Sequence, residues 1–202
     1  MPPSSNSLKY LLLGLSALAT WIQAPPSQAQ TNAQQTIASC SACHGEDGSP
    51  KDSRLPVIWG QNSTYLQKQL MAYRSGQRDN QIMGSMAESV PKDLIPSLAQ
   101  ELSNHSWPTK SHEDMEIAKE PVVNSRASGP KSLGLCLSCH RTDPSTTADG
   151  TPRLWGQNLE YLLDQMSAFT QDDRTTNESM SAIMKTISKN EQNEIARFFS
   201  SH

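Results

Sequence analysis

The feature that most constrains this chain is a five-residue unit that occurs twice. Residues 40–44 read CSACH, and 96 positions later residues 136–140 read CLSCH. The flanks repeat as well, because residues 55–78 match residues 151–174 at the same offset and share an identical Trp-Gly-Gln-Asn run. One extra residue in the second copy then changes the offset to 97. Two matched copies indicate a duplication rather than a solenoid, which usually needs at least three repeats.

Each copy has little material for a core of its own. The chain has 202 residues, of which 35% are hydrophobic and only 5% aromatic. A unit of roughly 75 to 80 residues is marginal without a staple or a bound cofactor. The formal net charge of −3 offers no basic face to nucleic acid. We therefore expect two small units in which something other than side chains helps to fill the middle.

The coarse structure is predicted to be helical. Residues 63–76 place Leu66, Leu70 and Tyr73 at the i, i+4, i+7 spacing of an amphipathic helix, and residues 159–169 repeat the pattern. No alternating strand pattern competes with it. The predicted fold class is therefore all-α, with two tandem domains.

The last helix of each copy has its own start signal. Residues 188–191, SKNE, form a Ser-x-x-Glu capping box. The helix that follows is expected to bury three apolar side chains: Ile195, Phe198 and Phe199. In the first copy Pro91 replaces the capping Ser, and Pro96 would disrupt a helix interior. The matching helix is therefore expected to start late, near Ile95 or Pro96.

Residues 1–29 are predicted to be a signal peptide. Lys9 supplies a positive n-region, residues 10–22 an apolar stretch of h-region length, and Ser27 and Ala29 the small residues of a cleavage site. The alternative is a retained membrane anchor, since a slightly longer apolar run would span a bilayer. Cleavage after Ala29 predicts an exported, periplasmic protein, which would be membrane-associated only if the segment were retained.

The two copies are separated by a polar stretch that contains three prolines, residues 104–132, which is predicted to be a connector. The expected organisation is a signal peptide, a first domain, a linker and a second domain: residues 1–29, 30–105, 106–130 and 131–202.

The Cys-x-x-Cys-His unit has a direct chemical meaning. Two thiols about one helical turn apart can each add to a vinyl group of haem, and the adjacent His can present a nitrogen to the iron. The sequence therefore predicts two covalent haem c groups, held by four cysteines and two histidines: Cys40, Cys43, His44, Cys136, Cys139 and His140. Zinc bound by the four thiols is an alternative, but the pairs lie in separate copies and zinc explains neither His. A thioredoxin-like redox pair would need a βαβ setting, which is absent.

The second axial ligand decides between a carrier and an enzyme. Iron held by His alone has an open face, whereas His and Met saturate it and Met raises its reduction potential. From the residues alone, the candidates are Met83 or Met86 in the first copy and Met180 or Met184 in the second. Three further histidines stand in polar surroundings and are expected to be solvated rather than ligands: His105, His112 and His202.

Other repeated residues are expected to support the haem. Pro56 and Pro152 each lie twelve positions after the His of their unit, so their carbonyls can accept the second imidazole N–H and fix its tautomer. The alternative is that both are ordinary loop prolines. Four further residues are expected to donate to haem carboxylates, with core packing as the alternative for the tryptophans: Trp59, Trp155, Arg78 and Arg174.

Both copies resemble class I c-type cytochromes, and the pair resembles the dihaem cytochrome c4 family. The shared pattern is Cys-x-x-Cys-His, then Pro-x-x-x-Gly-Gln (PVIWGQ and PRLWGQ), then an aromatic helix, an Arg, a Met and a closing helix. In that family the ligand Met lies seven residues before the closing segment, which implies Met83 and Met180. The stretch GPKSLGL before Cys136 departs from the family, because it predicts a poorly formed first helix in the second copy.

The resemblance implies an electron carrier rather than an enzyme, with one electron moving through each haem. Its partners would be redox proteins, such as membrane oxidase or reductase complexes or a flavoprotein, met through small transient surfaces. Neither nucleic acid nor a small-molecule substrate is expected. One alternative is the dihaem electron-accepting subunit of a larger oxidoreductase such as flavocytochrome c sulfide dehydrogenase. Another is a dihaem peroxidase or thiosulfate-oxidising enzyme with an open haem face.

Overall fold

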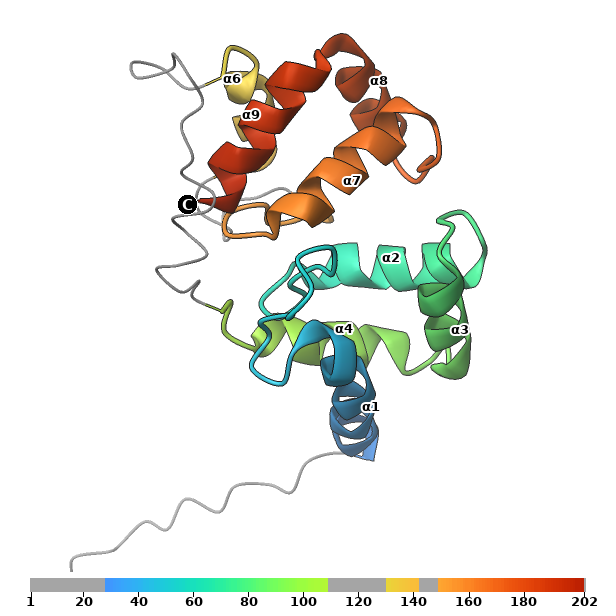
Figure 1. The fold of residues 1–202 in the computed structure, drawn as a ribbon. Coiled ribbons are helices and arrows are strands. Elements are labelled where there is room, and N and C mark those ends of the chain that lie inside the picture. The colour runs from blue at the N-terminus through green and yellow to red at the C-terminus, as the bar shows by residue number, and fades with distance from the viewer. Residues whose placement is uncertain (1–27, 109–129, 142–148, 202) are drawn as a thin grey trace, which may run out of the picture.

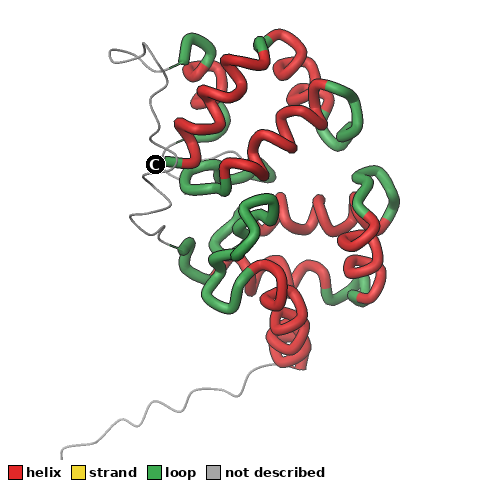
Figure 2. Tube along the Cα trace, in the orientation of Figure 1, coloured by secondary structure: helices red, strands yellow, loops and turns green. Residues whose placement is uncertain are grey.

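The computed structural model describes residues 28–108, 130–141 and 149–201. Over these ranges the chain consists of helices and loops, as Figure 2 shows, and the only β-type pairing is an isolated antiparallel bridge between Arg78 and Arg174. The all-α fold class is thus confirmed. The helices form two groups that lie one above the other in Figure 1, with α2 and α7 on the sides that face each other.

The first group contains four helices: α1 (Gln28–His44), α2 (Ser63–Arg74), α3 (Gln81–Ser89) and α4 (Ile95–Asn104). Its core lies where α1 and α2 pack against α4. Buried side chains from these three helices and from the residue after α3 make up this core: Ala33, Ile37, Leu66, Val90, Ile95, Leu98, Ala99 and Leu102.

The second group repeats this arrangement with α6 (Leu133–Leu137), α7 (Leu159–Thr170), α8 (Glu178–Thr186) and α9 (Lys189–Ser200). Helix α7 packs against both α8 and α9, as α2 packs against α3 and α4. Phe199 and Ile195 are fully buried at its centre, whereas Phe198, expected to be buried, is only partly covered.

Local sequence signals explain where several helices begin. The Ser188 hydroxyl accepts a hydrogen bond from Glu191 N at 3.3 Å, which is the contact of the predicted capping box. Helix α4 begins at Ile95 with Pro96 in its first turn, where a missing N–H costs no hydrogen bond. Asn80 and Asn177 cap α3 and α8 by accepting from the backbone N–H three residues later.

The two groups differ most in their first helix. Helix α1 has 17 residues, whereas α6 has only five, which agrees with the weak helix signal before Cys136. The short helix is held differently, because Ser132 N donates to the Glu191 carboxylate in the first turn of α9 at 2.7 Å. Glu191 thus ties the start of α6 to the start of α9.

The repeated glycine of the Trp-Gly-Gln-Asn run makes the same turn in both groups. Gly60 and Gly156 have φ values of 65° and 76°, a left-handed conformation that other residues rarely adopt. Their N–H groups donate to carbonyls of the closing helices, Leu102 at 2.9 Å and Phe199 at 2.8 Å. The run is therefore anchored to α4 in one group and to α9 in the other.

Polar side chains join the two groups at an interface between α2 and α7. Arg78 and Arg174, which are 6% and 5% exposed, lie side by side there. Each guanidinium donates to one Gln of its own group and to one Tyr and one Gln of the other, at 2.7–3.0 Å. The acceptors come from the two facing helices: Tyr65, Gln69, Tyr161 and Gln165.

The end of the first group reaches the second group directly. Trp107 follows α4, and the Arg153 guanidinium lies over its ring, 4.4 Å from the centroid. A Cβ at Gly156 would come within 2.9 Å of Trp107 Nε1, so the absence of a side chain there lets the indole approach. Trp107 therefore forms part of the interface.

Two predictions concern residues that lie largely outside the described ranges. Most of the predicted signal peptide does so, and its last two residues, 28 and 29, form the start of α1. Most of the linker, from residue 109 to residue 129, does so too. Among the helices that the structure describes, none is long and apolar enough to cross a membrane.

Candidate cofactor sites

The four cysteines lie at the ends of the first helices, and all four are free thiols. In each pair the first cysteine is less exposed than the second: Cys40 is partly buried and Cys136 is buried, whereas Cys43 and Cys139 are exposed. The Cys40 and Cys136 thiols each donate to a backbone carbonyl four residues earlier. Burial raises the pKa of Cys40 and of Cys136. The pairs belong to separate helical groups, which does not suit a shared zinc site, and no three metal-binding side chains cluster among the described residues.

Each histidine after a cysteine pair is buried and oriented by a proline carbonyl. Nδ1 of His44 donates to Pro56 O at 2.8 Å, and Nδ1 of His140 donates to Pro152 O at 2.9 Å. These are the contacts that the twelve-residue spacing predicts. Burial lowers the pKa of both imidazoles and the hydrogen bond to the carbonyl partly opposes that shift, so the neutral ring is favoured. With the proton on Nδ1, the Nε2 lone pair is the one available to a metal.

The candidate methionine ligands occupy matched positions. Met83 N donates to the capping Asn80 side chain at 2.9 Å, and Met180 N donates to Asn177 at 3.0 Å, so both are the third residue of a capped helix. Both side chains are partly exposed. Met184, in contrast, is 2% exposed and packs in the core of the second group. The fold thus pairs Met83 with Met180 and gives Met184 a packing role.

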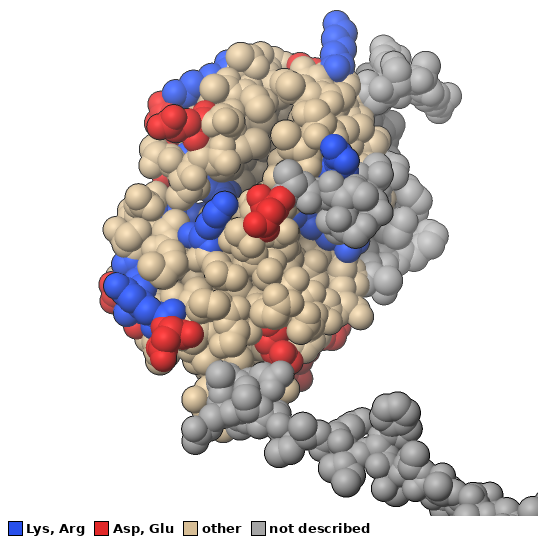
Figure 3. All heavy atoms as spheres, turned by 180° about the vertical axis from the view of Figure 1, so that it is seen from behind, with Lys and Arg blue, Asp and Glu red and all other residues tan. Residues whose placement is uncertain are grey.

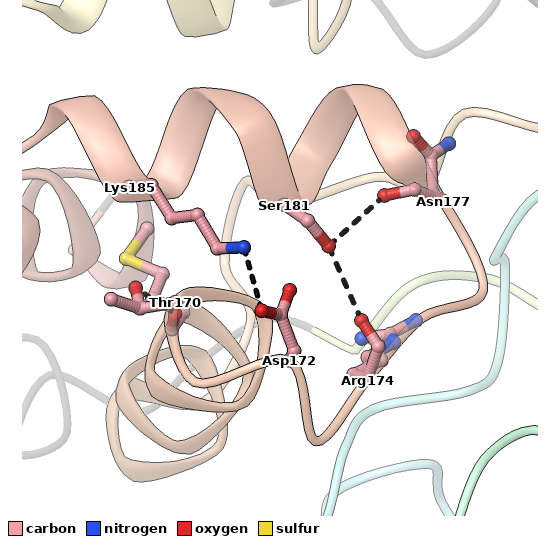
Figure 4. A network of polar contacts seen from close by, with 7 residues as sticks. Thr170, Asp172, Arg174, Asn177, Ser181 and Lys185 are labelled. Carbon is pink, nitrogen blue, oxygen red and sulfur yellow. Dashed lines mark hydrogen bonds and ion pairs between the residues drawn. The ribbon is translucent and has the colours of Figure 1, made fainter.

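The loop before Met180 is fixed by contacts that Figure 4 shows. Ser181 Oγ lies 3.4 Å from Arg174 O and 3.5 Å from Asn177 O, so it joins α8 to the end of the loop. Lys185 forms an exposed ion pair with Asp172 at 2.6 Å. These contacts hold the start of α8, and with it Met180, against the turn that follows α7.

The two repeated tryptophans have different surroundings. Trp155 Nε1 donates to Arg141 O at 2.9 Å, and its ring packs edge-on against Phe199. Trp59 stacks on His105 at 4.3 Å, and its buried Nε1 has no hydrogen-bond partner among the described residues. An unpartnered buried indole N–H needs an acceptor. Trp59 is therefore suited to donate to a carboxylate of a group bound beside it, whereas the indole N–H of Trp155 already donates to a backbone carbonyl.

Arg78 and Arg174, which were predicted to donate to haem carboxylates, lie at the interface between the two helical groups. Their described hydrogen bonds go to Gln and Tyr oxygens at the interface between the groups, and each guanidinium also stacks on a ring of its own group, that of Tyr73 or Phe169. The sequence repeat correctly marked Arg78 and Arg174 as important, but it did not show that they bridge the two copies. His112 and His202 lie outside the described residues, and His105 stacks on Trp59.

Sequence reasoning missed the part played by two buried glutamines and by Trp107. Gln61 and Gln157 are 3% and 2% exposed, and their side chains cross from one group to the other. Their identity in both copies was visible in the sequence, but a polar residue in a loop gives no indication of its partner. Trp107 lies outside the repeat and carries no such signal.

The arrangement fits covalent haem in both groups. Each offers two free thiols at a helix end, an adjacent imidazole whose Nδ1 is already engaged, and a methionine at a fixed helix position. The unpartnered Trp59 Nε1 adds a donor for a carboxylate in the first group. In c-type haem, two cysteine thiols are bonded to the porphyrin, and the iron is bound by the imidazole of a histidine and, in many cases, by the thioether of a methionine.

Comparison with known proteins supports this conclusion. No protein-family model matches the chain. It is 27% identical over 205 residues to the thiosulfate dehydrogenase electron acceptor of Stutzerimonas stutzeri, which covers 96% of this chain and 95% of that protein. It is also 27% identical over 181 residues to cytochrome c4 of Azotobacter vinelandii, which covers 84% of this chain and 85% of that protein.

Two shorter matches each cover about a third of this chain. Over 69 residues the chain is 36% identical to cytochrome c-554(548) of Halomonas halodenitrificans, covering 83% of that protein and 33% of this chain. Over 68 residues it is 32% identical to the cytochrome subunit of sulfide dehydrogenase of Chlorobaculum tepidum, covering 61% of that protein and 34% of this chain.

A solved structure has the same fold. Cytochrome c4 of Acidithiobacillus ferrooxidans superimposes with a TM-score of 0.64 at 27% identity, over 82% of this chain and 99% of that chain. Fold, cysteine–histidine units and relatives all agree. The chain is similar in sequence and in fold to the dihaem cytochromes c4, and it is an electron-transfer protein with two covalent haem c groups rather than an enzyme.

Proposed function

We propose that one iron is held by His44 and Met83 and the other by His140 and Met180. The observation that carries this assignment is the matched placement of the two methionines, each the third residue of an Asn-capped helix. Met184 is buried in the core, and the residue that matches it in the first copy is Ala87. The thioether bonds would form at Cys40, Cys43, Cys136 and Cys139.

This ligand set suits electron transfer. Haem would supply a one-electron couple when bound, and one histidine and one methionine of the chain would leave no position on its iron for a substrate. The residues of this chain hold the geometry constant: Pro56 and Pro152 fix the imidazole planes, and Asn80 and Asn177 fix the helix starts that carry the methionines. Little therefore has to move when an electron arrives or leaves.

We assign one haem to each helical group, with residues 30–105 and 131–202 as the two domains and 106–130 as the linker. Two separate cores support this division, because no buried residue is shared between them. The protein is placed in the periplasm after removal of residues 1–29, on the strength of the n-region, h-region and cleavage pattern of that segment.

The partner is proposed to be a dehydrogenase that oxidises an inorganic sulfur compound. The relative matched over 96% of this chain is named as the electron acceptor of thiosulfate dehydrogenase. The protein would take electrons from such an enzyme one at a time and pass them to a terminal redox complex. On the face in Figure 3, Lys and Arg lie among Asp and Glu without a large area of one sign, which suits a transient contact rather than a strongly steered one.

A second candidate is a stable subunit of a larger enzyme. The match to the cytochrome subunit of sulfide dehydrogenase favours it, although that match covers only 34% of this chain. Purification distinguishes the two functions. A mobile carrier purifies alone, whereas a subunit co-purifies with a flavoprotein in a constant ratio.

The ligands are tested by optical spectroscopy of the purified protein. An alkaline pyridine spectrum should count two haems per chain, and the oxidised protein should show the near-infrared absorption of Met–Fe(III). Met83→Ala and Met180→Ala should each remove about half of that band, since each would open one iron. Met86→Leu and Met184→Leu are the controls, because leucine keeps most of the volume of the buried Met184 side chain, and both should leave the intensity of the band unchanged. A full band in Met83→Ala would overturn the assignment.

A further inference from the structure

Two side-chain amides cross the interface and pair with the backbone of the opposite group. Gln61 accepts from Arg153 N at 2.7 Å and donates to Arg153 O at 3.0 Å. Gln157 does the same to Val57, accepting from its N at 2.8 Å and donating to its O at 2.9 Å. Each glutamine therefore pairs with one residue of the other group as a neighbouring strand would.

The peptide that each glutamine contacts is the one that orients the opposite histidine. The Pro152–Arg153 peptide donates its N–H to Gln61 and accepts at its C=O from His140 Nδ1, at 2.9 Å. The Pro56–Val57 peptide is bound by Gln157 and His44 in the same way. Two continuous hydrogen-bond chains thus run from an imidazole, through one peptide group, to an amide of the other domain.

Such a chain is polarised along its length. A peptide whose N–H is donated to a good acceptor carries more negative charge on its carbonyl oxygen, so it accepts more strongly at the other end. A stronger acceptor at Nδ1–H makes the imidazole a better electron donor to a metal. The effect is not diluted by water, because Gln61 and Gln157 are only 3% and 2% exposed.

We propose that Gln61 and Gln157 are positioning residues that act across the domain interface, each setting the hydrogen bond of the proximal histidine in the opposite domain. Gln61 acts on His140, and Gln157 acts on His44. The inference rests on the proposed function, since it takes these histidines as axial ligands. It means that the reduction potential of each haem depends on a residue of the other domain.

The test uses the complete dihaem protein and the volume-matched variants Gln61→Met and Gln157→Met. Haem and ligand resonances are assigned in NMR spectra through the thioether bridges at Cys40 and Cys136, and the two midpoint potentials are followed in a redox titration. Gln61→Met should raise the potential of the haem bound by His140 and speed the exchange of its Nδ1 proton. Gln157→Met should do both to the haem bound by His44.

Two controls make the result specific. Arg78→Met removes hydrogen bonds to other interface residues and leaves those of Gln61 and Gln157 in place. It should therefore not shift the potential of one haem alone. Gln61→Glu keeps an acceptor for Arg153 N–H, so the protection of the His140 Nδ1 proton should remain. The same variant is measured in place of Gln61→Met if that variant does not fold.

The outcomes separate this inference from the ligand assignment. Wild-type spectra show at the outset whether each His is an axial ligand, whatever the variants then do. Given that, a shift confined to the haem of the mutated domain, or equal shifts of both haems, would overturn the crossed assignment. A shift of the opposite haem in both variants would support it.

Discussion

The two domains share their last three helices and differ mainly at their first. Domain 1 begins with α1, a helix of 17 residues, whereas domain 2 begins with the five-residue α6 and a hydrogen bond from Ser132 to Glu191. The repeated tryptophans differ too, because Trp155 Nε1 binds a backbone carbonyl and Trp59 Nε1 has no partner among the described residues. The chain therefore carries two sites with the same donors in unequal surroundings.

The two copies of the sequence repeat thus surround their cysteine–histidine units differently. Second-sphere hydrogen bonds, burial and solvent access all tune a haem whose ligands are fixed. We therefore expect two different potentials from one ligand set. The interface, by contrast, is nearly symmetric, because Arg78 and Arg174 exchange equivalent contacts. Substitutions can test the symmetric interface and the unequal surroundings of the two haem sites separately.

The largest expected effect comes from the core of domain 2. Phe199 is fully buried where domain 1 has Leu102. Phe199→Ala should lower the free energy of unfolding by about 3–5 kcal/mol, because it leaves a cavity that the helices cannot close. Guanidinium unfolding followed by haem absorbance measures it. Phe199→Leu imitates domain 1 and should cost clearly less; an equal cost would show that shape, not volume, decides.

The next effect tests the symmetry of the interface. Arg78→Met and Arg174→Met each remove charge-assisted hydrogen bonds to Tyr and Gln, and each should cost about 1.5–3 kcal/mol of unfolding free energy. Because the two guanidinium groups share acceptors, the double variant should cost less than the sum. The same denaturation experiment measures all three. Strict additivity would contradict a shared network.

A smaller effect distinguishes the tryptophans. Trp155→Phe loses the hydrogen bond to Arg141 O and should cost about 1 kcal/mol in unfolding free energy beyond the change in packing. Trp59→Phe loses no described protein hydrogen bond. Its expected effect is instead a change in the potential of the haem of domain 1, with the other unchanged, as measured by redox titration. Equal shifts in the potentials of both haems would contradict a hydrogen bond from Trp59 to a haem carboxylate in domain 1.

The smallest effect concerns the turn after α2 and α7. Gly76 has φ 73°, and Asp172 occupies the matching position with φ 62°. Gly76→Ala should cost about 1 kcal/mol, since a left-handed conformation disfavours a Cβ. Asp172→Gly should change the unfolding free energy by less than about 0.5 kcal/mol, because relief of strain offsets an exposed ion pair. Thermal unfolding measures both, and a large loss in Asp172→Gly would show that the pair with Lys185 matters more.

Features encoded over short distances could be predicted from the sequence. The cysteine–histidine units, the cap at Ser188, the late start of α4 at Ile95 and the weak helix before Cys136 each depend on neighbours within a few residues. The proline contacts lie only twelve residues from the histidines. Repetition strengthened these predictions, because each signal could be checked in a second copy.

The interface could not be predicted in the same way. Arg174 donates to Tyr65, 109 positions earlier, and Gln61 pairs with Arg153, 92 positions later. Repetition marked these residues but gave no information on whether they face a cofactor or the other copy. Buried polar residues have to be satisfied by something, and only the docking of the domains shows what.

Trp107 has a consequence for how the halves stay together. Its indole already lies under Arg153 and against Gly156 before the chain enters residues 109–129. The start of the proposed linker is thus part of the interface, and only residues 109–129 remain as a plain connection between the two halves. A protease that cuts once between residues 109 and 129 should leave a nicked protein that migrates as a single particle, and this stretch should tolerate changes in length over evolution.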